Sequence, residues 1–526
     1  MAGLVTGRYG ALMNLRWMLA GALILAVCAW FAAQRILWWA VLLSGAMVLA
    51  GASSYAIHRM RLPEWDDRPP REARLTLRVD RTFPQSDAKK ATGLGRVKPS
   101  DAPWHELAGQ RIYFSLALRK GEAAPLPTSE ISAIGVLAAL PKAPEPNSFE
   151  SYLDDVGINF RLQRGRIVAA VRPPTLYARF CAAAVAQFRV ILALGIESKR
   201  PELAALLRAM ILGETHELSA EQQTLFRDSG TMHLFAISGM NIAVLAAALQ
   251  AVLLQPLRRW PPVKFALGTA LLWLFVDITG AAPSAVRAFA MAVFVQGALA
   301  LWQPAGILAA LVASALLVLV LAPLQFFSAS FVMSYGIVAT LLLLGLPLGE
   351  TWIARWTPWA ALPRVTRRWW QHKVSDAWRW TAAALAVGVS TTLVGLLTGV
   401  QYFGLLTPGS LVTNLALIPA AGVVTLSGFA ALVFGLTGWN GGAIFCNHAS
   451  AVALLCIERV VRLGVAVPGA FVPARFTVTW MGGVALAALG TSLMAGYALG
   501  WRRTAGGFWP PFVLVAAALI FGVKFG

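Results

Sequence analysis

The chain has 526 residues, of which 58% are hydrophobic and 13% are charged, and its mean hydropathy is +0.66. Because soluble domains carry roughly 25% charged residues, this composition excludes an ordinary soluble protein. Apolar runs of about 20 residues, the length that crosses a bilayer as a helix, recur and predict a polytopic α-helical membrane protein. The net charge of +20 is explained either by basic cytoplasmic loops or by a polyanionic partner.

Residues 1–58 are predicted to form a transmembrane helical hairpin. Its two apolar runs, 17–33 and 36–57, are separated only by Gln34 and Arg35. Because a second apolar run follows the first at once, the first is predicted to be a retained helix and not a cleaved signal.

Residues 59–172 have the pattern of a small soluble β domain. Proline and charge replace the long apolar runs, and three stretches alternate between apolar and polar residues, as strands with one buried face do. The apolar members of these stretches are Leu75, Leu77 and Val79, then Ile112, Phe114 and Leu116, and finally Ile158, Phe160 and Leu162. Segment 81–104 is predicted to be a loop. The domain is only mildly basic, with 19 Lys and Arg against 14 Asp and Glu.

Residues 173–213 are predicted to be amphipathic helices at the membrane interface, and residues 214–526 to be a transmembrane channel domain. The apolar spans of this domain lie near 232–255, 263–280, 284–302, 306–321, 326–346, 381–399, 409–434, 442–461, 478–500 and 508–525. Together with the hairpin they give about 12 crossings.

Segment 350–380 mixes seven tryptophans with basic residues. Such a mixture is typical of the headgroup level of the cytoplasmic leaflet, and it is also what a nucleic-acid surface of arginines and stacking rings would contain. Interface anchoring is favoured. The basic loop after span 232–255, with Arg258, Arg259 and Lys264, is also predicted to be cytoplasmic, which places the β domain on the outer side.

Span 232–255 is preceded by a polar lead and begins with polar side chains of its own. His233, Ser238 and Asn241 lie within its first turns. Polar groups in a lipid-length helix are costly unless they face a cavity or a partner, so this helix is predicted to face the interior of the bundle. In the next two spans, Arg287 either pairs with Asp277 or faces a water-filled passage, and the sequence leaves both open.

Several stretches resemble the ComEC competence-protein family in sequence and in their order along the chain. They are HLFAISGMNIAVL after LSAEQQTLFRDSG, GAAPSAVRAFAM, FVMSYGIVATLLL and PGSLVTNLALIPA, with EPNSFESYLDDVGI after the β domain. The family motif carries a histidine where this chain has Asn241. The resemblance implies an OB-like barrel for the β domain and a channel that admits single-stranded DNA in natural transformation.

OB-like barrels bind single strands with a basic groove and stacking aromatic rings. The candidate residues for such binding are Arg74, Arg78, Arg111, Tyr113 and Arg161, although a ring such as Tyr113 is equally suited to packing. The candidates for the DNA path are His233, Ser238, Asn241, Asp277 and Arg287.

No enzymatic centre is predicted. The six histidines are scattered, so no metal site and no cofactor is expected, and the chain resembles a ComEC protein without the metallo-β-lactamase-like domain in which many ComEC proteins end. His233 and Ser238 are five residues apart, a spacing that does not bring two helical side chains together for catalysis. The sequence has no phosphate-binding Gly-x-x-x-x-Gly-Lys-Ser/Thr loop, so a separate motor is expected.

The function that the resemblance implies is an inner-membrane channel for the uptake of single-stranded DNA in bacteria. The expected partners are single-stranded DNA, membrane lipid, a cytoplasmic motor and a DNA receptor, with a separate nuclease as a further candidate. The alternatives are a transporter or processing enzyme for another anionic polymer or lipid-linked saccharide, and a structural membrane scaffold.

Overall fold

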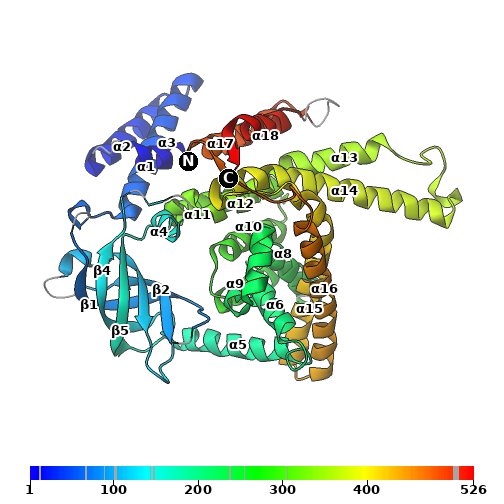
Figure 1. Cartoon of the computed structure of the whole chain (residues 1–526). Coiled ribbons are helices and arrows are strands. Elements are labelled where there is room, and N and C mark those ends of the chain that lie inside the picture. Colours follow the sequence, from blue (N-terminus) through cyan, green and yellow to red (C-terminus); the bar gives the residue numbers. More distant parts are fainter. Residues whose placement is uncertain are drawn as a thin grey trace. The chain divides into compact units, whose positions relative to one another are not determined.

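The protein is a multi-pass membrane protein whose chain forms two compact units (Figure 1). The computed structural model describes all residues except 11–13, 66–67, 88, 100–103, 143, 146–147, 236–238, 254, 305, 502–508 and 526. The first unit is Met1–Ala182 with Ala315–Ser328, and the second is Ala183–Ser314 with Ala329–Gly526. Among the described residues, ten helices are long and apolar enough to cross a membrane, and three more are apolar but shorter.

These helices confirm the polytopic prediction and add one candidate to it. The three shorter helices are α2 (Leu15–Phe31), α11 (Ile307–Leu321) and α18 (Trp509–Gly522), each of which was predicted as a span. Helix α5 (Leu176–Ala193), which was predicted to lie at the interface, is by length and composition also a candidate span.

The first unit consists of N-terminal helices and a closed β barrel. The helices are α1 (Ala2–Tyr9), α2 and α3 (Ile36–Arg59), and α2 and α3 form the predicted hairpin. The barrel consists of β1 (Arg71–Phe83), β2 (Lys90–Val97), β3 (Arg111–Ala117), β4 (Glu130–Ala139) and β5 (Phe160–Arg172), with the short helix α4 (Phe149–Asp155) between β4 and β5. The strand order is β1-β2-β3-β5-β4, and only the β3–β5 pair is parallel. This closed five-stranded barrel agrees with the OB-like fold that the resemblance implies.

The alternating residues of the sequence fill the inside of the barrel. Its core contains Leu75, Leu77, Ile112, Phe114 and Leu162, each fully buried, while the intervening residues point outward.

The prediction of a loop over 81–104 is wrong, because β2 lies within it. The sequence of β2, KATGLGRV, lacks the large inward side chains that mark a strand. A Cβ added to Gly93 would lie 2.6 Å from Cζ of Phe114, so the ring of Phe114 occupies the space that inward side chains of β2 would need.

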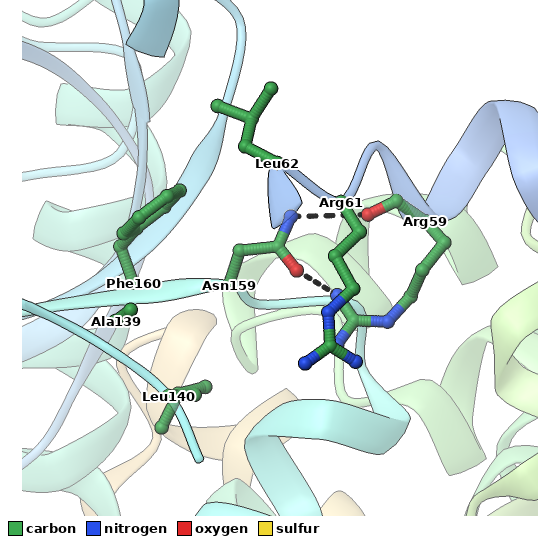
Figure 2. A pocket seen from close by; sticks show the side chains of 7 residues that line it. All are labelled: Arg59, Arg61, Leu62, Ala139, Leu140, Asn159 and Phe160. Carbon is green, nitrogen blue, oxygen red and sulfur yellow. Dashed lines mark hydrogen bonds between the residues drawn. The ribbon is translucent and has the colours of Figure 1, made fainter. Parts of the chain in front are cut away.

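A junction of buried polar groups joins the end of α3 to the barrel. Asn159 donates to the carbonyl oxygen of Arg59 over 3.1 Å, and its own amide oxygen accepts from the Arg59 guanidinium (Figure 2). Arg59 also donates to Oδ1 of Asp154 in α4 at 2.5 Å, and Arg8 of α1 contacts Asp154 and Asp155 at 3.3 and 2.7 Å. The cavity beside Arg59 and Asn159 has about 10 Å³, room for one water molecule, so this region is a structural joint and not a ligand pocket.

The second unit is a helical bundle. Its helices include α6 (Pro201–Leu212), α7 (Ala220–Asp228), α8 (Gly239–Ala248), α9 (Pro261–Ile278), α10 (Pro283–Ala300), α12 (Ala329–Thr340), α13 (Leu346–Arg355), α14 (Trp369–Thr398), α15 (Ser410–Leu436), α16 (Asn440–Val465), α17 (Met481–Ala498) and α18. Helices α15 and α16 run side by side (Figure 1). A sheet of three short strands, in the order β6 (Leu405–Leu406), β7 (Val472–Phe476) and β8 (Val523–Phe525), joins the loops at one end of the bundle.

Helix α6 is buried along its length, and the prediction of an interfacial helix is wrong for it. Every residue from Leu203 to Leu212 is buried, including Arg208. The guanidinium of Arg208 can be buried because two carboxylates contact it, Glu217 at 2.5 Å and Glu197 at 3.1 Å. The charge that suggested an amphipathic helix is thus neutralised inside the bundle.

The tryptophan-rich segment between α13 and α14 is internally ordered. Trp356 packs edge-to-face on Trp378, with ring centroids 4.9 Å apart, and Trp359 packs likewise on Trp370 at 5.3 Å. Arg367 donates to the carbonyl oxygen of Trp359 at 2.8 Å. Both predicted roles of this segment, at the lipid interface or against nucleic acid, remain predictions.

Candidate functional site

The motif HLFAISGMNIAVL does not form one continuous helix with its polar lead. Ser219 caps the start of helix α7, and its hydroxyl accepts from the backbone N–H of Gln222 in a capping box. After α7 the chain turns at Gly230, where φ is +67°. The 3-10 helix η4 (Thr231–Leu234) follows. Residues 228–231 therefore include the end of α7, the turn at Gly230 and the start of η4.

The structure separates the predicted polar residues of the motif. His233 lies in η4, is exposed, and its Nδ1 is 3.0 Å from the carbonyl oxygen of Gly230. Ser238 falls outside the described residues. Asn241 lies in α8 and is 2% exposed. His233 and Asn241 thus belong to different elements and do not share one helical face.

Asn241 connects three helices. Its Nδ2 donates to the carbonyl oxygen of Met210 in the last turn of α6 at 3.0 Å, and its Oδ1 accepts from the hydroxyl of Thr425 in α15 at 3.1 Å. The last carbonyl groups of a helix have no partner within the helix, so Asn241 satisfies one of the α6 carbonyls. Its side chain holds α8, α6 and α15 together, and a place on the DNA path remains a prediction.

Arg287 in α10 is 0% exposed. Its Nη2 donates to the carbonyl oxygen of Ser330 at 2.8 Å and to the hydroxyl of Ser330 at 2.6 Å. Ser330 lies in α12. Asp277, the partner that the sequence suggested, lies near the end of α9 and is half-buried. Gly239, the first residue of α8, packs on Ala288 next to Arg287, which brings the motif helix against this part of α10.

The outer face of the barrel carries a row of arginines. Arg78 of β1 lies directly opposite Arg96 of β2, and Arg96 lies opposite Arg111 of β3. Like charges directly opposite one another destabilise a sheet unless a side chain of opposite charge lies near them. Glu130 faces Arg78 from β4 and Asp80 lies 4.0 Å from Arg111, which leaves an excess of positive charge on this face.

Three aromatic rings lie on the same side of the barrel. Tyr113 of β3 contacts Phe149 edge-to-face at 5.1 Å, and Phe149 stacks on Tyr152 at 6.0 Å, both from α4. Phe149 is 52% exposed and Tyr152 is 41% exposed. Exposed rings beside arginines are the arrangement that single-strand-binding surfaces use.

Of the residues predicted for this face, Arg78, Arg111, Tyr113 and Arg161 come together, whereas Arg74 points outward near β4 and bonds Ser132 at 3.2 Å. Arg161 forms an ion pair with Glu150 of α4. Four further residues of this face were not among the predicted ones: Arg81, Arg96, Phe149 and Tyr152. A signal for the two rings was present, because an aromatic pair at i and i+3 occupies one face of a helix.

Two guanidinium groups on this face, those of Arg111 and Arg81, are partly removed from solvent. Burial lowers the pKa of Arg111 from its ordinary value, and Asp80 only partly opposes this. Burial likewise lowers the pKa of Arg81, with Tyr152 nearby. Both remain cations at neutral pH, because the ordinary pKa of arginine lies far above neutral. A phosphate placed here would replace the solvation that burial has removed.

Within the part of the chain that the structure describes, no group of three or more His, Cys, Asp or Glu side chains has the arrangement of a metal site.

Comparison with known proteins connects these features to one family. The chain is 30% identical over 144 residues to ComE operon protein 3 of Bacillus subtilis (strain 168), a match that covers 27% of this chain and 18% of that relative. No solved structure matches the chain. The profile of the family described as Competence protein matches residues 210–503, more than half of the sequence. The matched region begins in α6 and includes η4, α8, α10 and β6–β7. The chain therefore belongs to the competence protein family.

Proposed function

We propose that this protein admits single-stranded DNA across the bacterial inner membrane, with the barrel as a site of first contact and the helical bundle as the path. Family membership supports a role in competence. The observation that carries the proposal is the row Arg78, Arg96 and Arg111 beside exposed aromatic rings. Cations bind the phosphates of the strand, and the rings stack with its bases.

The aromatic rings favour a nucleic acid over other anionic polymers. The arginine row alone would attract any polyanion. Phe149 and Tyr152 offer exposed π-faces, and Phe149 contacts Tyr113, which lies two residues after Arg111 on β3; unpaired bases are the groups that use such faces. Duplex DNA, whose bases are stacked on each other, would leave the rings unused.

In this proposal the chain carries no catalytic step. DNA enters from the outer side, a separate cytoplasmic motor supplies energy, and a separate receptor delivers the strand. A separate nuclease is the proposed source of the single strand.

The decisive experiment is uptake of labelled DNA by cells that lack the gene and by cells complemented with variants. Deletion should abolish saturable uptake, and the wild-type gene should restore it. The triple variant Arg78→Gln, Arg96→Gln, Arg111→Gln should restore membrane-inserted protein but not uptake. The matched control neutralises exposed basic residues of the same domain away from this row, Arg119→Gln with Lys120→Gln. Undiminished uptake in the deletion strain would refute the proposed function.

A further inference from the structure

The small sheet at one end of the bundle carries a second concentration of positive charge. In the antiparallel pair of β7 and β8, Arg475 lies directly opposite Lys524. Both side chains are exposed, on the face of the sheet opposite to the buried Ala474. Two cations in register repel one another, and such a pair destabilises the sheet by itself.

Within the described parts of the chain, neither residue forms an ion pair. Arg475 instead lies along the turn at Gly404, where its Nε is 3.6 Å from the position a Cβ of Gly404 would take. The backbone supports this placement, since Ala474 donates to the carbonyl oxygen of Gly404 at 3.0 Å. The two cations are held next to each other by main-chain pairing, and no carboxylate of the described residues forms an ion pair with them.

The same sheet contacts the beginning of the family motif. Gly230, the left-handed turn before η4, packs against Thr407 and Leu405, with 3.0 Å from its ideal Cβ to Cγ2 of Thr407. Leu405 pairs with Pro473 of β7, two residues from Arg475. His233, which contacts the Gly230 carbonyl, therefore lies at the end of the bundle that also holds the Arg475–Lys524 pair.

We propose that Arg475 and Lys524 form a phosphodiester-binding site that holds the DNA strand at the motif end of the helical bundle. This inference rests on the proposed function and adds a specific contact to it. The chemistry follows from the pair: two adjacent cations match one phosphodiester or two successive ones, and an anion removes the repulsion between them. The sheet that carries the pair packs, through Leu405 and the neighbouring Thr407, on the turn at Gly230 before η4, and this position at the motif end of the bundle favours the strand over a lipid headgroup.

The first test measures the reactivity of Lys524 in the purified full chain, in nanodiscs of zwitterionic lipid. Acetylation of Lys524 by an amine reagent is quantified by mass spectrometry with and without oligothymidylate, and with inorganic tripolyphosphate as a base-free probe. Both anions should protect Lys524 in the wild-type protein and fail to protect it in Arg475→Gln. The exposed Lys199 serves as the control lysine and should react equally throughout. Equal acetylation of Lys524 with and without both anions would overturn the site.

The second test measures oligothymidylate affinity as a function of salt. Loss of one or two phosphate contacts should reduce the slope of log K against log salt by about 0.7 or about 1.4 in the double variant Arg475→Gln, Lys524→Gln, because each phosphate contacted on a single strand contributes about 0.7. The variant Arg200→Gln, an exposed arginine at the start of α6, should leave the slope unchanged. An unchanged slope in the double variant overturns the inference.

Two further outcomes separate the possible failures. If anionic lipid in the nanodisc protects Lys524 and the strand adds nothing, the site binds a headgroup and the proposal is overturned. If tripolyphosphate and oligothymidylate protect Lys524 while deletion of the gene leaves DNA uptake intact, the phosphodiester site stands and the proposed cellular function falls.

Discussion

Arg287 bonds Ser330 twice through one nitrogen, at 2.8 Å to the carbonyl oxygen and at 2.6 Å to the hydroxyl, and so joins α10 to α12. A fully buried guanidinium is expensive at membrane depth, so its partners determine whether the bundle tolerates it. Ser330 is therefore the residue to substitute together with Arg287.

We expect Ser330→Ala to lower the stability of the purified protein by roughly 1 kcal/mol and Arg287→Ala to lower it by more, because hydrogen bonds to charged groups are the stronger ones. The double variant should be no less stable than Arg287→Ala alone, since both changes remove the same interaction. Thermal unfolding in detergent measures these effects. Two results together would instead identify Asp277 as the partner. The stability losses of Ser330→Ala and Arg287→Ala would be additive, and those of Arg287→Ala and Asp277→Ala would not.

The second prediction concerns Asn241, where the family motif carries a histidine. A neutral imidazole has one donor and one acceptor, and two bonds of Asn241 are of these kinds: it donates to the Met210 carbonyl and accepts from the Thr425 hydroxyl. We therefore expect Asn241→His to keep most of the stability, while Asn241→Leu loses roughly 1–3 kcal/mol because the Met210 carbonyl loses this donor. Equal destabilisation by both substitutions, in the same unfolding measurement, would contradict this structural role.

The third prediction tests the stacking role of Phe149. Phe149→Leu keeps an apolar side chain against Tyr113 but removes the exposed ring, so the barrel should stay folded and its affinity for oligothymidylate should fall by roughly 1–3 kcal/mol. Fluorescence anisotropy of a labelled strand measures the affinity, and circular dichroism checks the fold. A folded Phe149→Leu protein with wild-type affinity would remove the ring from the binding surface.

Alternation of apolar and polar residues was enough to predict three strands of the barrel, because each buries a large side chain at every second position. It could not predict β2, whose inward positions include Gly93 and Gly95 under the ring of Phe114. That space is filled from a neighbouring strand, so the local sequence carries no sign of it. The short strands β6, β7 and β8 are likewise defined by pairing between distant loops and not by a pattern of their own.

In the candidate sites too, some features were visible in the local sequence and others depend on contacts between distant residues. The motif and its polar residues were visible in the sequence, but the bonds of Asn241 reach residues 31 and 184 positions away. Arg208 suggested the polar side of an interfacial helix, because its two carboxylate partners lie outside α6. Glu197 precedes the helix and Glu217 follows it. A charged residue in a helix predicts an exposed face only if no oppositely charged partner contacts it, and the fold determines whether such a partner is present.

The fourth prediction concerns the junction between α3 and the barrel. Asp154→Asn removes the carboxylate that contacts both Arg59 and Arg8, and we expect a loss of roughly 2–4 kcal/mol, because it leaves a buried arginine without its ion-pair partner. Hydrogen exchange of α4 and of the start of β5 should accelerate. Glu72→Gln, at an exposed carboxylate on β1, is the control and should change neither quantity. Unchanged exchange in Asp154→Asn would show that the ion pairs do not hold the junction.

The fifth prediction is that the barrel lies on the outer side of the membrane. In a variant without the four native cysteines, Ala123→Cys places a thiol at an exposed position between β3 and β4. An impermeant maleimide should label it in intact spheroplasts, with Ala360→Cys in the tryptophan-rich segment as the inner-side control that reacts only after lysis. The reverse pattern would refute this orientation.

The polar junction at Arg59 also determines how the barrel responds to a mechanical load. Only residues 60–62 separate α3 from the 3-10 turn η1 (Pro63–Trp65) that precedes the barrel, so the connection at this point is short. The ion pairs from Arg8 and Arg59 to Asp154 and Asp155 act in parallel with the covalent connection and would all have to shear together. If the barrel binds the strand as proposed, a pull on that strand would be transmitted through these ion pairs to α1 and α3.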